Sequence, residues 1–137
     1  MLTAAERHDL MTKIRRLPVA VETAVKDLTD AQLNTPYREG GWTVGQVVHH
    51  LADSHLNGFL RMKLMLTEVG PVLKPYDQDA WAKLPDTAAL PIDSSMLILT
   101  GLHERWFALL ESLPEASWSR SALHPEVGVV TLADLLV

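Results

Sequence analysis

The chain has 137 residues, a formal net charge of −5 and no cysteine, and 47% of its residues are hydrophobic while 21% are charged. These values fit one globular domain that buries roughly two thirds of its unfolded surface, and they exclude a disordered chain. The acidic balance without a basic run makes nucleic acid a poor candidate partner, and the lack of cysteine excludes disulfides, thiolate nucleophiles and cysteine-type zinc sites.

Neither a membrane span nor a targeting segment is visible. No stretch approaches the roughly 20 apolar residues that a span requires, so we expect no membrane association. The N-terminus carries Glu6, Arg7, His8 and Asp9 where a signal peptide would have an apolar segment. Absent cysteine suits a cytoplasmic protein, although it leaves the compartment open.

The first predicted helix runs from about Thr3 to Leu28, where apolar residues recur at steps of three or four. Pro18 lies inside this range and is expected to kink the helix or divide it in two. Thr29 can then cap a short helical turn over residues 30–33. A loop follows and ends at Gly40-Gly41.

A second helix is predicted over residues 44–67. It follows Thr43 and Gln46, which have the spacing of a capping box, and it carries an apolar stripe. The long connection over residues 69–93 holds four prolines. Connections of this length are usually functional or contain short helices, and residues 77–84 are the candidate for such a helix.

A third helix is predicted from Ser94 to Leu113, before a polar, turn-rich connection that contains His124. No segment shows sustained strand alternation. Thr131 and the three residues after it are typical of a new helix start, and the chain ends a few residues later. We therefore predict an all-α, up-down four-helix bundle in one domain over residues 1–137, with its fourth helix only begun and the C-terminal part of the domain missing.

Three of the six histidines, His49, His50 and His55, lie within seven residues on the second predicted helix. At about 100° per residue, His55 falls near the centre of the apolar stripe, His50 lies on its flank and His49 points further toward solvent, near Asp53. Imidazole is the commonest metal ligand and general base near neutral pH, so this cluster is the candidate chemical site. No pair has the spacing with which two imidazoles on one helix bind one ion, so at most one should bind a given metal.

Structural or surface histidines are the alternative interpretation of this cluster. His103 and His8 are expected to be solvated or capping residues, and His124 is open to either role because it precedes a proline in a turn. No nucleophile elbow, phosphate loop or dinucleotide fingerprint is present. Trp81, in the long connection, could cover a pocket, but core and loop anchoring is the simpler expectation for all the tryptophans: Trp42, Trp81, Trp106 and Trp118.

The segment from Pro36 to His55 resembles the YfiT-like branch of the DinB-like superfamily. The resemblance implies a four-helix bundle, often dimeric, that acts as a metal-dependent hydrolase; thiol S-transferases that use bacillithiol or similar thiols are among the relatives. It also implies a divalent metal, often nickel or zinc, bound by three histidines. Further matching positions extend over nearly the whole chain: Asn57, Arg61, and residues 63–64, 66–68, 74–77, 80–81 and 102–106.

By this resemblance His50, immediately before Leu51, is a metal ligand, and His55 is the second choice. The other two ligands of the family form an HxxxH pair on the fourth helix, after Thr131–Leu136, and the chain ends before that pair. The candidates for the pocket wall are Asn57, Arg61, Glu68, Asp77 and Trp81.

The resemblance also implies the partners. We expect a small-molecule substrate, for which a low-molecular-weight thiol is one candidate, and a second copy of the chain in a homodimer. The alternative function is a non-catalytic helical module for binding or dimerisation, or a metal-free remnant of the enzyme.

Overall fold

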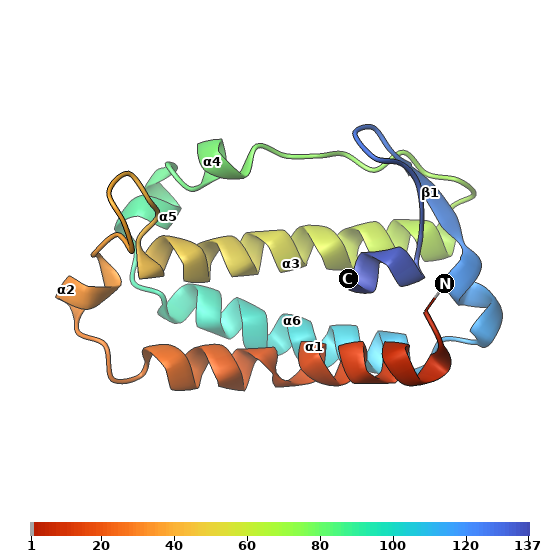
Figure 1. Ribbon diagram of the computed structural model, residues 1–137, viewed down its shortest axis with the longest axis horizontal. Helices are drawn as coiled ribbons and strands as arrows, with labels where there is room; N and C mark the ends of the chain where they lie inside the picture. Colours follow the sequence, from red (N-terminus) through yellow and green to blue (C-terminus); the bar gives the residue numbers. More distant parts are fainter. Residues whose placement is uncertain (1) are drawn as a thin grey trace.

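The computed structural model describes residues 2–137, and three long helices lie along one another in it (Figure 1). These are α1 (Ala4–Val25), α3 (Val44–Thr67) and α6 (Asp93–Glu111). None of the helices in the described residues is long and apolar enough to cross a membrane. The shorter elements are α2 (Asp30–Leu33), α4 (Gln78–Trp81), α5 (Pro85–Ala89), the 3-10 helices η1 (Glu115–Ser119) and η2 (Ala133–Leu136), and the strands β1 (Ser121–His124) and β2 (Gly128–Thr131).

The capping box predicted at the start of α3 is confirmed. The side chain of Thr43 accepts a hydrogen bond from the amide of Gln46 (3.1 Å), and the side chain of Gln46 accepts one from the amide of Thr43 (2.9 Å). Gln46 also donates to the carbonyl of Ala82 (2.9 Å). The residues that begin α3 therefore also hold the end of α4 against it.

Pro18 does not divide α1, which is continuous through it. A proline has no amide hydrogen, so Pro18 cannot donate to the carbonyl of Ile14 four residues earlier. That carbonyl instead accepts a hydrogen bond from Nδ1 of His103 on α6, at 2.6 Å. A side chain from a neighbouring helix thus replaces the donor that the proline removes.

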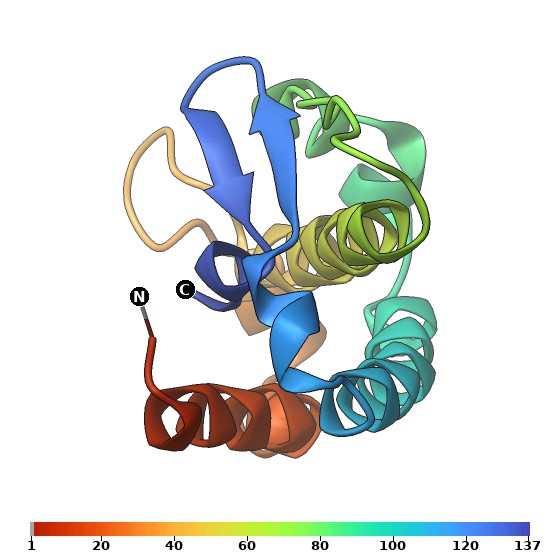
Figure 2. The ribbon, with the colours of Figure 1, turned by 90° about the vertical axis from the view of Figure 1, so that its right-hand side faces the viewer.

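The three long helices form three corners of a bundle, as the end view in Figure 2 shows, and η2 lies near the fourth corner. The N-cap residue of η2 is Leu132, which makes no side-chain cap, so the predicted threonine cap lies one residue too early; Thr131 instead donates from its hydroxyl and its amide to the carboxylate of Asp134 (2.7 and 2.8 Å). The described residues of this last segment form a 3-10 turn rather than an α-helix. Fully buried side chains fill the centre of the bundle: Met62, Met65, Leu73, Leu99, Leu110 and Leu132.

The expectation that the chain contains no strand is wrong, because β1 and β2 form an antiparallel hairpin from Ser121↔Thr131 to His124↔Gly128. Each strand has only four residues, too few to show alternation in the sequence. The hairpin is fixed to the long connection: the amide of Leu73 donates to the carbonyl of Leu123 (2.9 Å), and the amide of Leu123 donates to Pro71 (2.9 Å).

Candidate functional site

His50 is the candidate ligand, and its ring lies on α3 against the edge of Trp42. The two ring centroids are 4.9 Å apart and the planes meet at 69°. Trp42 directly precedes the Thr43 cap, so the capping box that starts α3 also places the indole beside this imidazole. Among residues 2–137 no hydrogen bond engages either ring nitrogen of His50, in contrast to His49 and His103.

His49 is buried, and the expectation that it points toward solvent is wrong. Its Nε2 lies 3.0 Å from the carbonyl of Leu90, which can only accept, so this nitrogen carries the proton. Its Nδ1 then accepts a hydrogen bond from the hydroxyl of Ser95 at 2.7 Å. A helical projection places His49 outside the apolar stripe, but α5 and the start of α6 cover that side of α3. Both nitrogens of His49 are occupied.

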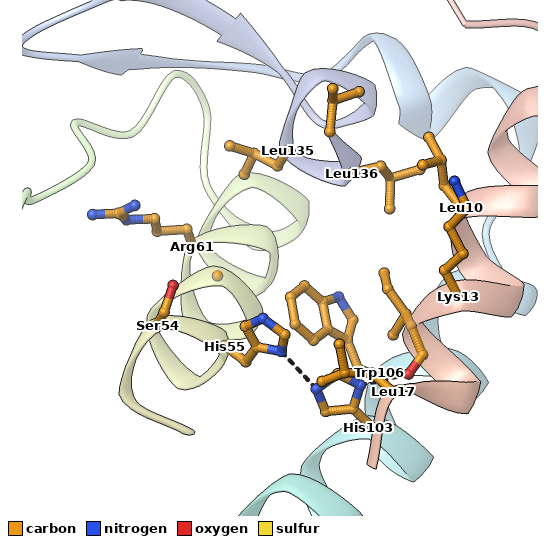
Figure 3. A pocket seen from close by; sticks show the side chains of 13 residues that line it. Leu10, Lys13, Leu17, Ser54, His55, Arg61, His103, Trp106, Leu135 and Leu136 are labelled. Carbon is orange, nitrogen blue, oxygen red and sulfur yellow. Dashed lines mark hydrogen bonds between the residues drawn. The ribbon is translucent and has the colours of Figure 1, made fainter. Parts of the chain in front are cut away.

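His55 on α3 and His103 on α6 form a hydrogen-bonded pair that was not predicted (Figure 3). His103 is 1% exposed, so the expectation that it is solvated is also wrong. Its Nδ1 donates to the carbonyl of Ile14, and its Nε2 lies 2.7 Å from Nδ1 of His55. The ring of Trp106 stands edge-on to both imidazoles.

The imidazoles of this pair are neutral near pH 7. Burial, followed by the nearby His103 and His50, lowers the pKa of His55 to about 4. Burial also lowers the pKa of His103, against the opposing effect of its hydrogen bond to Ile14. Desolvation disfavours the charged form of an imidazole, and no carboxylate contributes to either shift.

A cavity of about 370 Å³ lies between α1, α3, α6 and η2, with His55 and Trp106 on one side of it (Figure 3). Lys13 and Arg61 are its charged lining residues, and none of the carboxylate side chains of residues 2–137 lines it. The remaining walls are mostly apolar. Their leucine and isoleucine members lie on α1 and η2: Leu10, Ile14, Leu17, Leu135 and Leu136.

Two of the predicted pocket residues on α3 hydrogen-bond to backbone carbonyls. Asn57 donates to Asp53 one turn earlier (2.9 Å), and Arg61 donates to Lys74 in the long connection (2.7 Å). Only Arg61 of the five predicted wall residues lines the His55 cavity, and Figure 3 shows its guanidinium pointing away from His55. Its Nε is buried without a partner among the described residues.

The other three predicted wall residues lie at the ends of helices. Glu68 is the C-cap residue of α3, and Asp77 caps α4 by accepting from the amide of Ala80 (2.9 Å). Trp81 packs on Tyr76, with ring centroids 4.5 Å apart, and is 37% exposed. Glu68 lines a pocket at the end of α3 together with Met65 and Arg120, and that pocket includes neither Asp77 nor Trp81 nor His50.

The residues 2–137 do not complete a metal centre by themselves. They contain no group of three or more His, Cys, Asp or Glu side chains that could hold a metal ion. Catalytic zinc-type sites use about three protein ligands and keep one position open. His50 can supply one such ligand, because its imidazole has unoccupied nitrogens.

Known proteins resemble this chain over most of its length. The family model described as the DinB superfamily matches residues 13–137. A protein of Geobacillus kaustophilus, provisionally named a metal-dependent hydrolase, is 55% identical over 123 residues, which cover 90% of this chain and 68% of the relative. A Bacillus mycoides protein with the same description is 50% identical over 121 residues, covering 88% and 69%. The chain therefore spans about two thirds of the length of the curated relatives it matches.

A solved structure resembles this chain in both fold and sequence. YfiT from Bacillus subtilis, described as a probable metal-dependent hydrolase with an unusual four-helix bundle topology, matches with a TM-score of 0.95 and 42% identity. The match covers 99% of this chain and 78% of YfiT. The predicted likeness and the predicted helical-bundle fold are both confirmed.

Proposed function

Because this chain belongs to the DinB superfamily, we propose that it is the part of a metal-dependent hydrolase that supplies His50 as a metal ligand. The observation that carries the proposal is the state of the four histidines on α3 and α6. His49 and His103 use both ring nitrogens within the bundle, and His55 uses one of them, whereas His50 uses neither among the described residues. An imidazole must offer a lone pair to bind a metal, and His50 is free to do so.

The other ligands of the proposed centre come from outside residues 2–137, because one imidazole cannot hold a divalent ion tightly. Nickel or zinc is the proposed metal, since imidazole suits both. Such an ion, when bound, activates water for attack on a substrate. Within this chain, Trp42 packs against the His50 ring, and the Thr43–Gln46 cap fixes the start of α3, which lies between the two residues.

The proposed substrate is a small molecule, and the proposed location is the cytoplasm. Transfer of a low-molecular-weight thiol is the second candidate reaction, and it rests on the resemblance of residues 36–55 to the YfiT-like branch.

The proposal is tested by measuring the metal content of a form of the protein that is extended to the length of its curated relatives. His50→Phe removes both ring nitrogens and keeps an aromatic ring against Trp42. His8→Phe is the matched control, because His8 is exposed on α1. After dialysis against zinc or nickel, we expect elemental analysis to find about one ion per chain in the control and none in His50→Phe. Equal metal content in the two variants would contradict the assignment.

A further inference from the structure

We propose that Arg38 determines the substrate class of this protein, because its guanidinium binds a singly charged carboxylate on the small-molecule substrate. The proposal rests on the proposed function, since it places the substrate beside His50, but the binding that it predicts needs no metal. The site is a pocket of about 330 Å³ at the start of α3, a volume within the range of small-molecule sites.

The pocket lies between the loop that precedes α3, the first turn of α3 and the start of α4. Its apolar walls are Tyr37, Trp42 and Val47, and its polar side chains are Arg38 and Gln78. The two glycines of the loop complete the lining. These walls are separate from the cavity at the fourth corner of the bundle, which is lined by α1, η2, α6 and later turns of α3.

The pocket adjoins the proposed metal ligand. Trp42 forms one of its walls, and the same indole packs against His50 with ring centroids 4.9 Å apart. Val47 precedes His50 by three residues on α3, so the two side chains are neighbours on one face of the helix. A molecule that fills the pocket therefore lies next to the side chain that we propose as a metal ligand.

Arg38 is the charged lining residue of the pocket, and among residues 2–137 it forms no ion pair. Arg7, in contrast, is paired with Glu115 at 2.6 Å. Nε of Arg38 donates to the phenol oxygen of Tyr37 (2.8 Å), and Nη1 makes a long hydrogen bond to the carbonyl of Glu39 (3.5 Å). A guanidinium has more N–H donors than these two bonds use, and the remaining donors match the paired oxygens of a carboxylate.

The loop is shaped to hold this guanidinium in place. Gly40 has a φ of +68°, in the left-handed region that favours glycine. A Cβ at Gly41 would lie 2.7 Å from Cε1 of Tyr37 and 2.9 Å from Cγ of Arg38, closer than carbon atoms pack. Because residue 41 has no side chain, the guanidinium carbon of Arg38 can lie 5.3 Å from the centre of the Tyr37 ring. A side chain restrained in this way loses less entropy when it binds a ligand.

The walls of the pocket favour a carboxylate on an apolar body. One guanidinium balances one negative charge, whereas a dianion brings a second charge that no lining residue neutralises. Tyr37, Trp42 and Val47 offer apolar contact to the rest of the ligand. A neutral amide of the same shape forms only uncharged hydrogen bonds, which are about half as strong as those of a carboxylate.

Phenylacetate and phenylacetamide are suitable probes, because they share one ring and nearly one shape and only phenylacetate is charged. We measure their binding by calorimetry, with a chelator present, in the form extended to the length of the curated relatives. We expect phenylacetate to bind about tenfold more tightly. Arg38→Gln should lose this preference, whereas Arg16→Gln, which removes the same charge from an exposed position of α1, should keep it. Equal binding of the two probes by the unmodified protein, or no binding of phenylacetate, would overturn the proposal, as would a preference that survives in Arg38→Gln.

The indole signals in ¹H–¹⁵N spectra locate the bound probe. We expect phenylacetate to shift the signal of Trp42 and to leave that of Trp118 unchanged, since Trp118 is buried in η1, away from the pocket. A shift at Trp118 without one at Trp42 would overturn the proposed position. The chelator separates this result from the proposed function: if the protein bound no metal at His50 but kept the preference for phenylacetate, the metal site would fail and carboxylate binding by Arg38 would stand.

Discussion

Single histidines in this molecule acquire their chemistry from the groups that surround them. His49 and His103 have similar burial, and each is held at both nitrogens by a carbonyl and a second side chain. The ring of His50 packs against Trp42 and makes no hydrogen bond among residues 2–137, so its lone pair is available. A helical projection ranks these positions by direction, but it does not include the donors and acceptors that neighbouring helices bring.

The sequence therefore predicts part of the candidate site. The choice of His50 as the candidate ligand follows from the resemblance of the surrounding sequence to a known motif. Its assignment as a ligand stays a prediction. The pair of His55 and His103 could not be predicted, because it depends on how α3 and α6 are aligned along the bundle. One signal was present: Pro18 inside a helical pattern implies an unpaired carbonyl at Ile14, which needs a donor from elsewhere.

The buried pair makes stability depend on pH. The pKa of His55 is about 4 in the folded protein, below its ordinary value of 6.5. Between these values the unfolded chain binds more protons, so we expect the free energy of unfolding to decrease as the pH falls from about 6.5 to about 4. Urea unfolding at several pH values measures this dependence. His55→Phe should show a weaker decrease over the same range, and an unchanged slope would contradict the titration.

Helices in this chain begin where short-range signals place them. The bounds of α3 match the predicted residues 44–67, and those of α2 match residues 30–33, because the caps at Thr43 and Thr29 are local signals. The hairpin escaped prediction because each of its strands has only four residues, and its attachment to the long connection joins Leu73 and Leu123 across fifty residues of chain. Local patterns do not encode such pairing.

The cap of α3 gives a direct stability prediction. Thr43→Ala removes the acceptor for the Gln46 amide and should lower the free energy of unfolding by about 1 kcal/mol. The matched control is Thr100→Ala, on the exposed side of α6, where the hydroxyl bonds only to Met96 within the same helix. Its effect should stay within about 0.5 kcal/mol. Equal denaturation midpoints for the two variants would show that the cap does not stabilise the start of α3.

A second stability prediction concerns the energetic coupling between Pro18 on α1 and His103 on α6. His103→Phe leaves the carbonyl of Ile14 without a donor and should cost about 1–3 kcal/mol. In a Pro18→Ala background the amide of residue 18 can donate to that carbonyl, so the same substitution should cost about 1 kcal/mol less. A double-mutant cycle in urea measures the difference. The same cost in both backgrounds would show that Pro18 and His103 are independent.

At the scale of the whole molecule, the fourth corner of the bundle shapes what the domain can do. Figure 2 shows η2 there, and Figure 1 shows it beside only part of the length of α3. The face of α1 that adjoins this corner carries Leu10, Ile14 and Leu17, which line the His55 cavity. Apolar surface of this kind usually finds a partner, so a homodimer, or a helix contributed from elsewhere, stays our prediction.

Light scattering tests this prediction at micromolar concentration. We expect the 137-residue chain, at 15.2 kDa per copy, to show the mass of a dimer. A dimer that covers the fourth corner of the bundle should also slow hydrogen exchange at the α1 amides around Ile14. The reference is a sample diluted until the dimer dissociates. A monodisperse monomer would contradict the prediction.

The central claim is that His50 is the imidazole of this chain that binds the metal. Its most direct test is an anomalous difference map, recorded at the zinc edge, from crystals of the form extended to the length of the curated relatives. We predict a peak about 2.0–2.1 Å from a ring nitrogen of His50. A peak on His55, or full zinc occupancy with no density at His50, would contradict the account.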